Sequence, residues 1–455
     1  MTKNNRTRPG FRPLAVAALA AAVLGALALS QQASAAGFQL KENDVKSMGR
    51  AYAGSQTAGD DAAVVSNNPA AMSALKGTQF QADITAINVS AKFSGGGTDA
   101  LGRPLTGGNG GDAGDLIPVP AFDFVTQVGD RWHLGVGVHA PYGFKTEYDR
   151  DWVGRYQAVK SDIKVLDAVF SASYDVTDKF ALGFSAIAQR TSAELTQAIN
   201  FGTILALNPA VPPGLFLPQS ADGYGRLKGD DWGYGWQVGA YWRLSDADTL
   251  AASYRSKINH TITGNAEFTV PAQVRGVFAL NPLTAGLFTN TKGTADFDTP
   301  AYAELSYWHK VNDAFGLGAD LGWTKWDSLQ TLVVDYDNPA QPNSTEVFDY
   351  KNAWFVSFGG EYALSDQLSL RAGVAYDKTP TRDATRDPRV PDNTRKWLSL
   401  GLGYKPTANT EFNLGYSHLF VSDASINDTS PTGDHLVGKF SDKGDLFGVS
   451  GRFVF

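Results

Sequence analysis

The sequence predicts an all-β fold, namely a transmembrane antiparallel β-barrel of about 14 strands with an N-terminal hatch inside its lumen. Three observations predict this fold. Apolar residues alternate with small or polar residues along most of the chain, short and long connections follow each other in turn, and an export signal comes first. The expected domains are a signal peptide at 1–35, the hatch at 36–79 and the barrel at 80–455.

The first 35 residues have the order of a secretory signal peptide. Four basic residues precede or border an apolar run from Leu14 to Leu29, and Ala33-Ser34-Ala35 is a small-residue cleavage site. The run is about 16 residues long, which is short for a membrane-spanning helix of roughly 20 residues. We therefore expect cleavage after Ala35 and export of the remainder.

The mature chain is acidic and contains no cysteine. Loss of the four basic signal-peptide residues changes the formal net charge from −7 to about −11, so nucleic acid is not an expected partner. An exported chain without cysteine has no disulfide bonds. After residue 36 there is no stretch of 18 apolar residues, whereas the abundant aromatic residues and glycines suit a barrel that presents every second residue to lipid.

Period-two alternation is clear in the stretch that begins at Phe315, where Leu317, Leu321 and Trp323 alternate with glycine, aspartate and threonine. Successive side chains of a strand point to opposite faces, so such a stretch has one apolar face. Fourteen segments of this kind are expected at 80–93, 120–128, 131–140, 163–175, 179–199, 224–244, 248–264, 299–310, 313–335, 346–363, 367–379, 396–405, 409–421 and 445–455.

The connections between these segments alternate in length. Short turns such as Gly129-Asp130 and Ser365-Asp366 separate long connections such as 94–119 and 200–223. In hydrocarbon every backbone amide must be paired within the protein, so the sheet is expected to close on itself. A soluble propeller is the alternative, but its repeat of roughly 40 residues per blade is not visible.

The chain ends in an aromatic strand, with Phe447, Val449, Phe453 and Phe455 on one face. A terminal strand that ends in phenylalanine resembles the signal read by the barrel-assembly machinery of the Gram-negative outer membrane. The simpler interpretation is an ordinary last strand with an aromatic residue at the membrane interface, and both can hold.

The lumen of a barrel of this size is too wide for side chains of the wall to fill. It is therefore either an open aqueous pore, as in a general porin, or it contains a plug. Residues 36–79 precede the first strand, contain Gly-, Ala- and Asp-rich segments and show little alternation, so they are expected to form the plug.

Two blocks of sequence resemble the FadL/TodX family of outer-membrane transporters for long-chain fatty acids and hydrocarbons. The first block contains Ala36-Gly37-Phe38-Gln39-Leu40, Met48-Gly49-Arg50-Ala51-Tyr52-Ala53-Gly54, Asp60-Asp61-Ala62 and Asn68-Pro69-Ala70. The second contains Leu370-Arg371-Ala372-Gly373-Val374-Ala375-Tyr376-Asp377, Pro380, Arg386, Pro391-Asp392, Arg395 and Trp397-Leu398-Ser399. The resemblance covers essentially the whole mature chain.

The resemblance implies a 14-stranded barrel, a hatch in the lumen, and passive uptake of hydrophobic molecules that leave sideways into outer-membrane lipid. Crossing an aqueous lumen would cost a chain of ~16 carbons about 12 kcal/mol, which lateral release avoids. The implied exit is an inward kink of the third strand, and Gly135, Gly137 and Pro141 are its candidate residues. Asn68-Pro69-Ala70 corresponds to the family's hatch turn, in which the Asn side chain pins the backbone and Pro fixes φ.

Two long connections are unusually apolar and suit the capture of cargo. Packing of the two loops on each other as a cap is the structural alternative. The candidate substrate-binding residues in them are Phe201, Ile204, Leu205, Leu215, Phe216, Phe278, Leu287 and Phe288.

Arg190 and Lys325 are the candidate partners for a cargo carboxylate. The resemblance places basic residues near the end of the fifth strand and after the ninth-strand Trp, but here the matching positions read Leu195, Asp327 and Gln330. A carboxylate clamp is therefore displaced or absent, and aromatic or aliphatic hydrocarbons are the alternative cargo to long-chain fatty acids.

No catalytic, cofactor-binding or metal-binding pattern is expected. There is no G-x-S-x-G element, and the glycine-rich stretches at 95–97 and 107–111 lack a following helix. A lipase or protease with Ser and His on neighbouring walls is the enzymatic alternative, which the family blocks do not support. The histidines are scattered without metal-ligand spacing, at His133, His139, His260, His309, His418 and His435.

Overall fold

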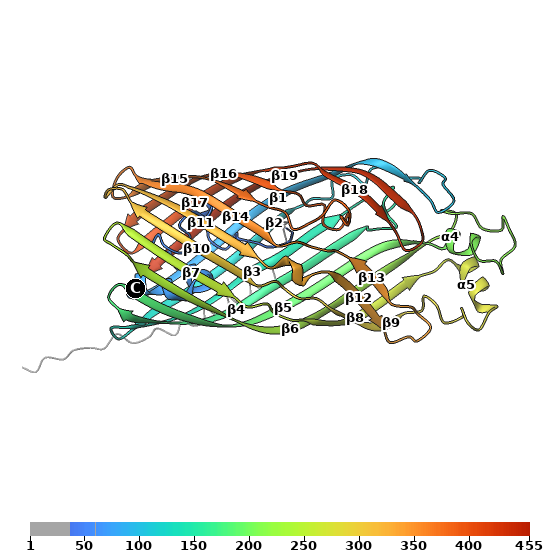
Figure 1. Ribbon diagram of the computed structural model, residues 1–455, viewed down its shortest axis with the longest axis horizontal. Helices are drawn as coiled ribbons and strands as arrows, with labels where there is room; N and C mark the ends of the chain where they lie inside the picture. The colour runs from blue at the N-terminus through green and yellow to red at the C-terminus, as the bar shows by residue number, and fades with distance from the viewer. Residues whose placement is uncertain (1–36, 60) are drawn as a thin grey trace, which may run out of the picture.

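The computed structural model describes residues 37–59 and 61–455. The expected signal peptide and its cleavage site, together with Ala36 and Asp60, lie outside the described residues. The molecule is a closed antiparallel barrel of 14 wall strands (Figure 1), which confirms the predicted fold class. No helix of the described part of the chain is long and apolar enough to cross a membrane.

The barrel closes between its first and last strands. β1 (Thr78–Thr98) pairs with β2 (Leu116–Val128) on one side and with β19 (His435–Val454) on the other. Each remaining wall strand is antiparallel to its neighbours, in chain order. They are β3 (Trp132–Glu147), β4 (Lys160–Thr177), β5 (Phe180–Asn200), β6 (Asp222–Arg243), β7 (Asp248–Arg255), β10 (Tyr302–Lys310), β11 (Phe315–Thr324), β14 (Ala353–Ala363), β15 (Leu368–Asp377), β16 (Arg395–Thr407) and β17 (Thr410–Val421).

Five further strands extend the wall at the end where the long connections lie. They are β8 (Thr261–Thr269), β9 (Thr291–Asp296), β12 (Thr331–Tyr336), β13 (Ser344–Val347) and β18 (Ala424–Thr429). The helices α4 (Phe201–Ala206) and α5 (Ala272–Ala279) lie at the same end (Figure 1).

Three expected strands are interrupted, and the one expected at 346–363 is divided between β13 and β14. The segment expected at 248–264 consists of β7 and β8, and the one expected at 313–335 consists of β11 and β12. In the break between β11 and β12, the 3-10 turn η2 (Trp326–Ser328) turns the Trp326 side chain fully inward. The chain thus leaves the wall at this point to fill the lumen, although its alternation continues on both sides.

The two faces of the wall differ as the alternation predicts. On β15 the outward side chains Leu370, Val374 and Tyr376 are 44–52% exposed, whereas the inward Arg371 is 3% exposed. Large apolar side chains are exposed in the same way on strands around the barrel. An apolar outer face combined with a polar inner face is the pattern of a barrel that sits in lipid.

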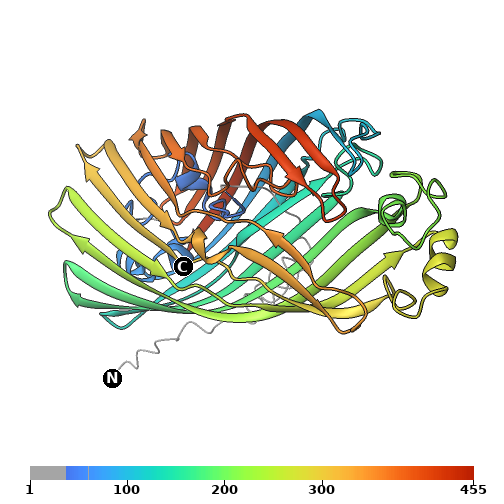
Figure 2. The same ribbon diagram turned by 45° about the vertical axis from the view of Figure 1, so that its right-hand side comes forward.

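The hatch lies inside the barrel, at the end with the short turns (Figures 1 and 2). Its regular elements are the short helices α2 (Val45–Met48) and α3 (Val64–Asn67) and the 3-10 helix η1 (Pro69–Ala74). Most of its described side chains are buried, polar ones included. A lumen filled in this way differs from the open pore that a general porin requires.

Glycines on the inner face let the hatch backbone touch the wall. A Cβ on Gly183 would lie 2.3 Å from the backbone nitrogen of Ala70, and one on Gly373 would lie 2.1 Å from the carbonyl oxygen of Arg50. Both distances are too short for any side chain, because non-bonded heavy atoms pack at about 3.5–4.0 Å. The glycine abundance therefore reflects, in part, close packing of the hatch.

The third wall strand bends in the middle. The register between β3 and β4 shifts between His139 and Tyr142, and the pairing of β2 with β3 ends at Phe122 and Val138. Residues 116–121 of β2 remain paired with β1 but have no β3 partner. The wall is thus interrupted between β2 and β3 next to Pro141.

Candidate functional site

The hatch turn is fixed by one buried side chain. Asn68 is fully buried, and its Nδ2 donates to Gln56 Oε1 at 2.9 Å and to the carbonyl oxygens of Ala240 and Ala252 at 3.3 and 3.2 Å. Its Oδ1 accepts a hydrogen bond from the backbone N–H of Ala70 at 3.0 Å and caps η1. The side chain therefore ties the hatch to itself and to the wall.

A second anchor lies on the neighbouring wall. The carboxylate of Asp320 on β11 accepts hydrogen bonds from the backbone N–H of Gly54 at 2.7 Å and from the Ser55 hydroxyl at 2.6 Å. Arg50 Nη1 lies 3.1 Å from the Glu361 carboxylate of β14. Charged and polar contacts of this kind hold the hatch in one orientation, and they must break if the hatch moves.

The leading segment of the hatch covers the bend of β3. The backbone N–H of Leu40 donates to the Pro141 carbonyl at 2.8 Å, and that of Gly143 donates to the Phe38 carbonyl at 2.7 Å. Residues 38–40 thus act as a partner for the part of β3 that has left β2. Phe38 then packs edge-on against Trp326, with ring centroids 4.6 Å apart.

Of the three residues expected at a lateral opening, the structure places Pro141 at the bend. Gly135 and Gly137 lie in the straight part of β3, paired with Val125 and Asp123 of β2. A Cβ on either glycine would press on hatch side chains of α3 and η1. The lack of a side chain at Gly135 and Gly137 therefore allows the hatch to pack closely against β3.

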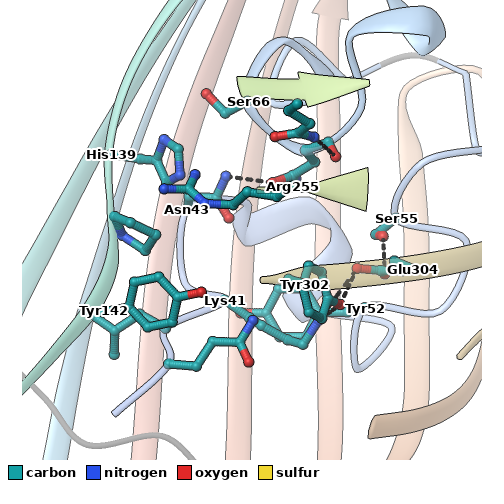
Figure 3. A pocket seen from close by; sticks show the side chains of 15 residues that line it. Lys41, Asn43, Tyr52, Ser55, Ser66, His139, Tyr142, Arg255, Tyr302 and Glu304 are labelled. Atoms are coloured by element: carbon teal, nitrogen blue, oxygen red, sulfur yellow. Dashed lines mark hydrogen bonds and ion pairs between the residues drawn. The ribbon is translucent and has the colours of Figure 1, made fainter. Parts of the chain in front are cut away.

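A cavity of about 70 Å³ lies between the hatch and the bend (Figure 3). Lys41 of the hatch lines one side, where its Nζ donates to Tyr302 Oη at 2.6 Å and lies 3.5 Å from Glu304. Arg255 lines the other side, near His139. The cavity is therefore polar and charged although it adjoins aromatic side chains of the hatch and wall.

A second cavity of about 70 Å³ lies between the outer halves of the strands. Its lining comes from β4, β5, β6, β8, β9 and β12 together with Phe297, and it is mainly aliphatic and aromatic. The apolar lining residues include Ile163, Ala193, Leu195, Leu227, Ile262, Ala266, Ala295, Phe297, Leu332 and Val334. This surface can accommodate a hydrocarbon but offers it few polar contacts.

The two apolar outer loops pack against each other. Phe201, Leu205 and Phe278 are buried, and Phe201 meets Phe278 and Phe288 edge-on with centroids 5.9 and 4.8 Å apart. Ile204, Phe216 and Phe288 pack on this cluster, whereas Leu215 remains 60% exposed and Leu287 is half-buried. The loops therefore form a cap, and Leu207, Leu280 and Leu283 on it present apolar surface to the outside.

Neither basic residue singled out in the sequence lines either of these two cavities. The Arg190 side chain is 48% exposed on the outward face of β5 and lies 3.3 Å from Asp230. Lys325 is 49% exposed at the start of η2 and lies 2.9 Å from Asp327. Both charges are used in exposed ion pairs, so the structure does not assemble a clamp from them.

Sequence reasoning missed Arg255 and Asp167. They lie 88 positions apart on β7 and β4, yet Arg255 Nη1 lies 2.5 Å from Asp167 Oδ2 inside the barrel. The signal available in the sequence was a charged residue at an inward position of a strand. That signal is weak, because many inward positions of this barrel are polar.

The hatch also contains a buried acid, Glu42, which is 2% exposed. Burial raises the pKa of the Glu42 carboxyl to about 7. The hydrogen bond from the backbone N–H of Lys41 lowers the pKa and offsets part of this effect. Within residues 37–59 and 61–455, no group of three or more His, Cys, Asp or Glu side chains is arranged to hold a metal ion.

A closed lipid-embedded barrel with a packed hatch, and a cavity beside a wall opening, defines the class of plugged outer-membrane transporters. The family model described as outer membrane protein transport protein (OMPP1/FadL/TodX) matches residues 26–455. The chain belongs to this family, whose members are transport channels rather than enzymes. It is accordingly an outer-membrane transporter for hydrophobic molecules.

Individual relatives are similar to this chain over nearly its whole length. Outer membrane protein P1 of Haemophilus influenzae is 30% identical over 427 residues, which cover 88% of this chain and 90% of the relative. The long-chain fatty acid transport protein of Salmonella typhi is 28% identical over 406 residues, with 88% and 91% covered. The crystal structure of a Pseudomonas aeruginosa FadL homologue superposes with a TM-score of 0.87 at 31% identity, covering 92% of this chain and 100% of that one.

Proposed function

We propose that the protein takes up long-chain fatty acids passively and releases them sideways into the outer membrane. The observation that carries this proposal is the interruption of the wall between β2 and β3 beside a cavity that reaches the hatch. The name of the Salmonella typhi relative supports the same cargo. Lateral release keeps the acyl chain out of water, which favours this route by about 12 kcal/mol for a chain of ~16 carbons.

Uptake begins at the apolar surface of the outer loops. Leu280 and Leu283 are both 84% exposed on the cap formed by the two loops. Apolar side chains exposed to this degree gain free energy by covering a hydrophobic molecule. The aliphatic cavity between the outer halves of the strands is the next binding site on the path inward.

Cargo leaves through the gap beside Pro141. Because residues 38–40 are hydrogen-bonded to the bent part of β3, cargo passes only when this contact opens. The Asn68 and Asp320 anchors keep the rest of the hatch in place during this step. The hatch turn therefore contributes a defined resting position for a segment that moves.

Uptake and conductance measured together test the proposal. Cells with the protein should accumulate labelled oleate faster than cells without it, while the purified protein in planar bilayers should carry no steady large ion current. A steady large current without cargo dependence would instead identify an open general porin and contradict the proposal.

Aromatic and aliphatic hydrocarbons are the second candidate cargo. The mainly apolar lining of the outer cavity favours them, since a neutral molecule needs no cationic partner there. Labelled toluene in the same uptake assay distinguishes the two cargoes.

We also propose that the last strand is the assembly signal read by the barrel-assembly machinery. Phe455 is 77% exposed, and its backbone N–H donates to the Thr78 carbonyl at 2.8 Å, at the seam where the barrel closes. Deletion of Phe455 should lower the amount of folded barrel in the outer membrane but leave refolding in detergent unchanged. Equal amounts in cells would contradict this role.

A further inference from the structure

We infer that Arg255 is a receptor for the carboxylate head group of the cargo, in the cavity beside the bend of β3. The inference rests on the proposed function, because it specifies the cargo chemistry of the same transport route. It assigns the cargo an anionic head group and gives that group a place distinct from Arg190 and Lys325.

Arg255 presents an unused hydrogen-bonding edge inside the barrel. Its side chain is 7% exposed, and Nη1 lies 2.5 Å from the carboxylate of Asp167. Among the residues that the structure describes, no acceptor takes a hydrogen bond from Nε or Nη2. These two N–H groups form the side-on fork of a guanidinium, whose spacing matches the two oxygens of a carboxylate.

A structural role alone does not account for this arrangement. Arg389 is a buried arginine that cross-links loops and wall, and its Nη1 and Nη2 donate to two carbonyl and two side-chain oxygens. Arg255, at a similar burial, uses only Nη1. Buried donors are nearly always paired, so an unpaired fork on a side chain that lines a cavity indicates a ligand.

The surroundings fit a molecule with a charged head and an apolar tail. Leu40, Pro141 and Tyr142 line the same cavity, and Tyr142 belongs to the aromatic cluster that continues to Phe38. In Figure 3 the Arg255 side chain points toward His139, on the side of the cavity formed by β3. A head group held there leaves the tail against apolar side chains next to the gap between β2 and β3.

The chemistry of the fork discriminates among hydrophobic molecules. A carboxylate supplies two charged acceptors, an alcohol supplies one neutral acceptor, and a hydrocarbon supplies none. A hydrocarbon in this cavity would leave both Arg255 donors buried and unpaired, which disfavours its binding relative to a fatty acid.

The test compares oleate with oleyl alcohol, which has the same chain and no charge. Binding of each labelled ligand to the purified full-length protein is measured at pH 8 by scintillation proximity. The variants are Asp167→Asn and the double change Arg255→Met with Asp167→Asn, which removes the buried ion pair without leaving an unpaired charge. Arg255→Lys and Arg389→Lys form a matched pair that keeps the charge and removes the fork.

The wild type should prefer oleate about tenfold or more. Asp167→Asn should increase that preference, because the Asp167 carboxylate competes for the guanidinium charge. The double variant and Arg255→Lys should reduce it while binding of oleyl alcohol stays, and Arg389→Lys should retain it. A preference unchanged in the double variant, or lowered by Asp167→Asn, would overturn the assignment of Arg255. Failure of the wild type to bind either ligand would instead overturn the proposed function.

Discussion

Replacement of Asn68 by alanine tests the hatch turn. The change removes two N–H donors of Nδ2, which are shared among three acceptors, and one hydrogen bond accepted by Oδ1. At roughly 1 kcal/mol each, the loss is about 3 kcal/mol of hatch docking, or roughly a hundredfold in the equilibrium for local opening. The wall strands keep all their ladder hydrogen bonds, so the barrel should still assemble.

Hydrogen exchange measures this loss directly. Amides of residues 64–74 should exchange roughly a hundredfold faster in Asn68→Ala, and uptake of oleate should fall because the hatch loses its defined resting position. Asn259→Ala, which changes an exposed side chain, is the control. Unchanged hydrogen exchange in the hatch would refute the role of the Asn68 hydrogen bonds. Unchanged oleate uptake would show that the hatch turn is not needed for transport.

Three further perturbations address packing, pH and capture. Gly183→Leu places a side chain 2.3 Å from the Ala70 backbone nitrogen. The hatch should therefore become sensitive to protease, while the barrel still resists unfolding in detergent. A hatch that stays resistant to protease would refute the close-packing argument. The Glu42 carboxyl has its pKa raised by burial from 4.5 to about 7, so hatch docking should be most stable below pH 4.5 and lose about 3 kcal/mol between there and pH 7. Glu42→Gln should flatten that profile in hydrogen exchange, and an identical profile would exclude Glu42 as its source. Leu280→Asp with Leu283→Asp should slow uptake severalfold at low oleate concentrations without changing the amount of barrel, whereas unaltered uptake would exclude the exposed cap from capture.

The wall strands were predictable because their side chains obey one local rule. In lipid an outward position must be apolar, so residues such as Leu370 and Val374 mark the strand in the sequence. The breaks between β7 and β8 and between β11 and β12 were not predictable. Alternation continues on both sides of each break, and the inward Trp326 packs against a residue as distant in the sequence as Phe38, nearly 300 residues away.

The candidate site was less accessible to sequence reasoning. Asn68 and Pro141 could be singled out, because asparagine and proline constrain the backbone locally. The roles of Gly183 and Arg255 depend on what lies opposite each of them across the lumen. The charge of Arg190 is visible in the sequence, but its outward direction follows from the register of β5.

A disulfide between the hatch and the bend tests most directly whether transport requires this contact to open. Gln39 and Tyr142 form an isolated antiparallel bridge whose neighbours carry the hydrogen bonds, so their Cα atoms lie close enough for a disulfide. The chain has no other cysteine. Oleate uptake through Gln39→Cys with Tyr142→Cys should stop in the oxidised protein and return after reduction. Equal uptake in the oxidised and reduced forms would contradict release through the gap beside Pro141.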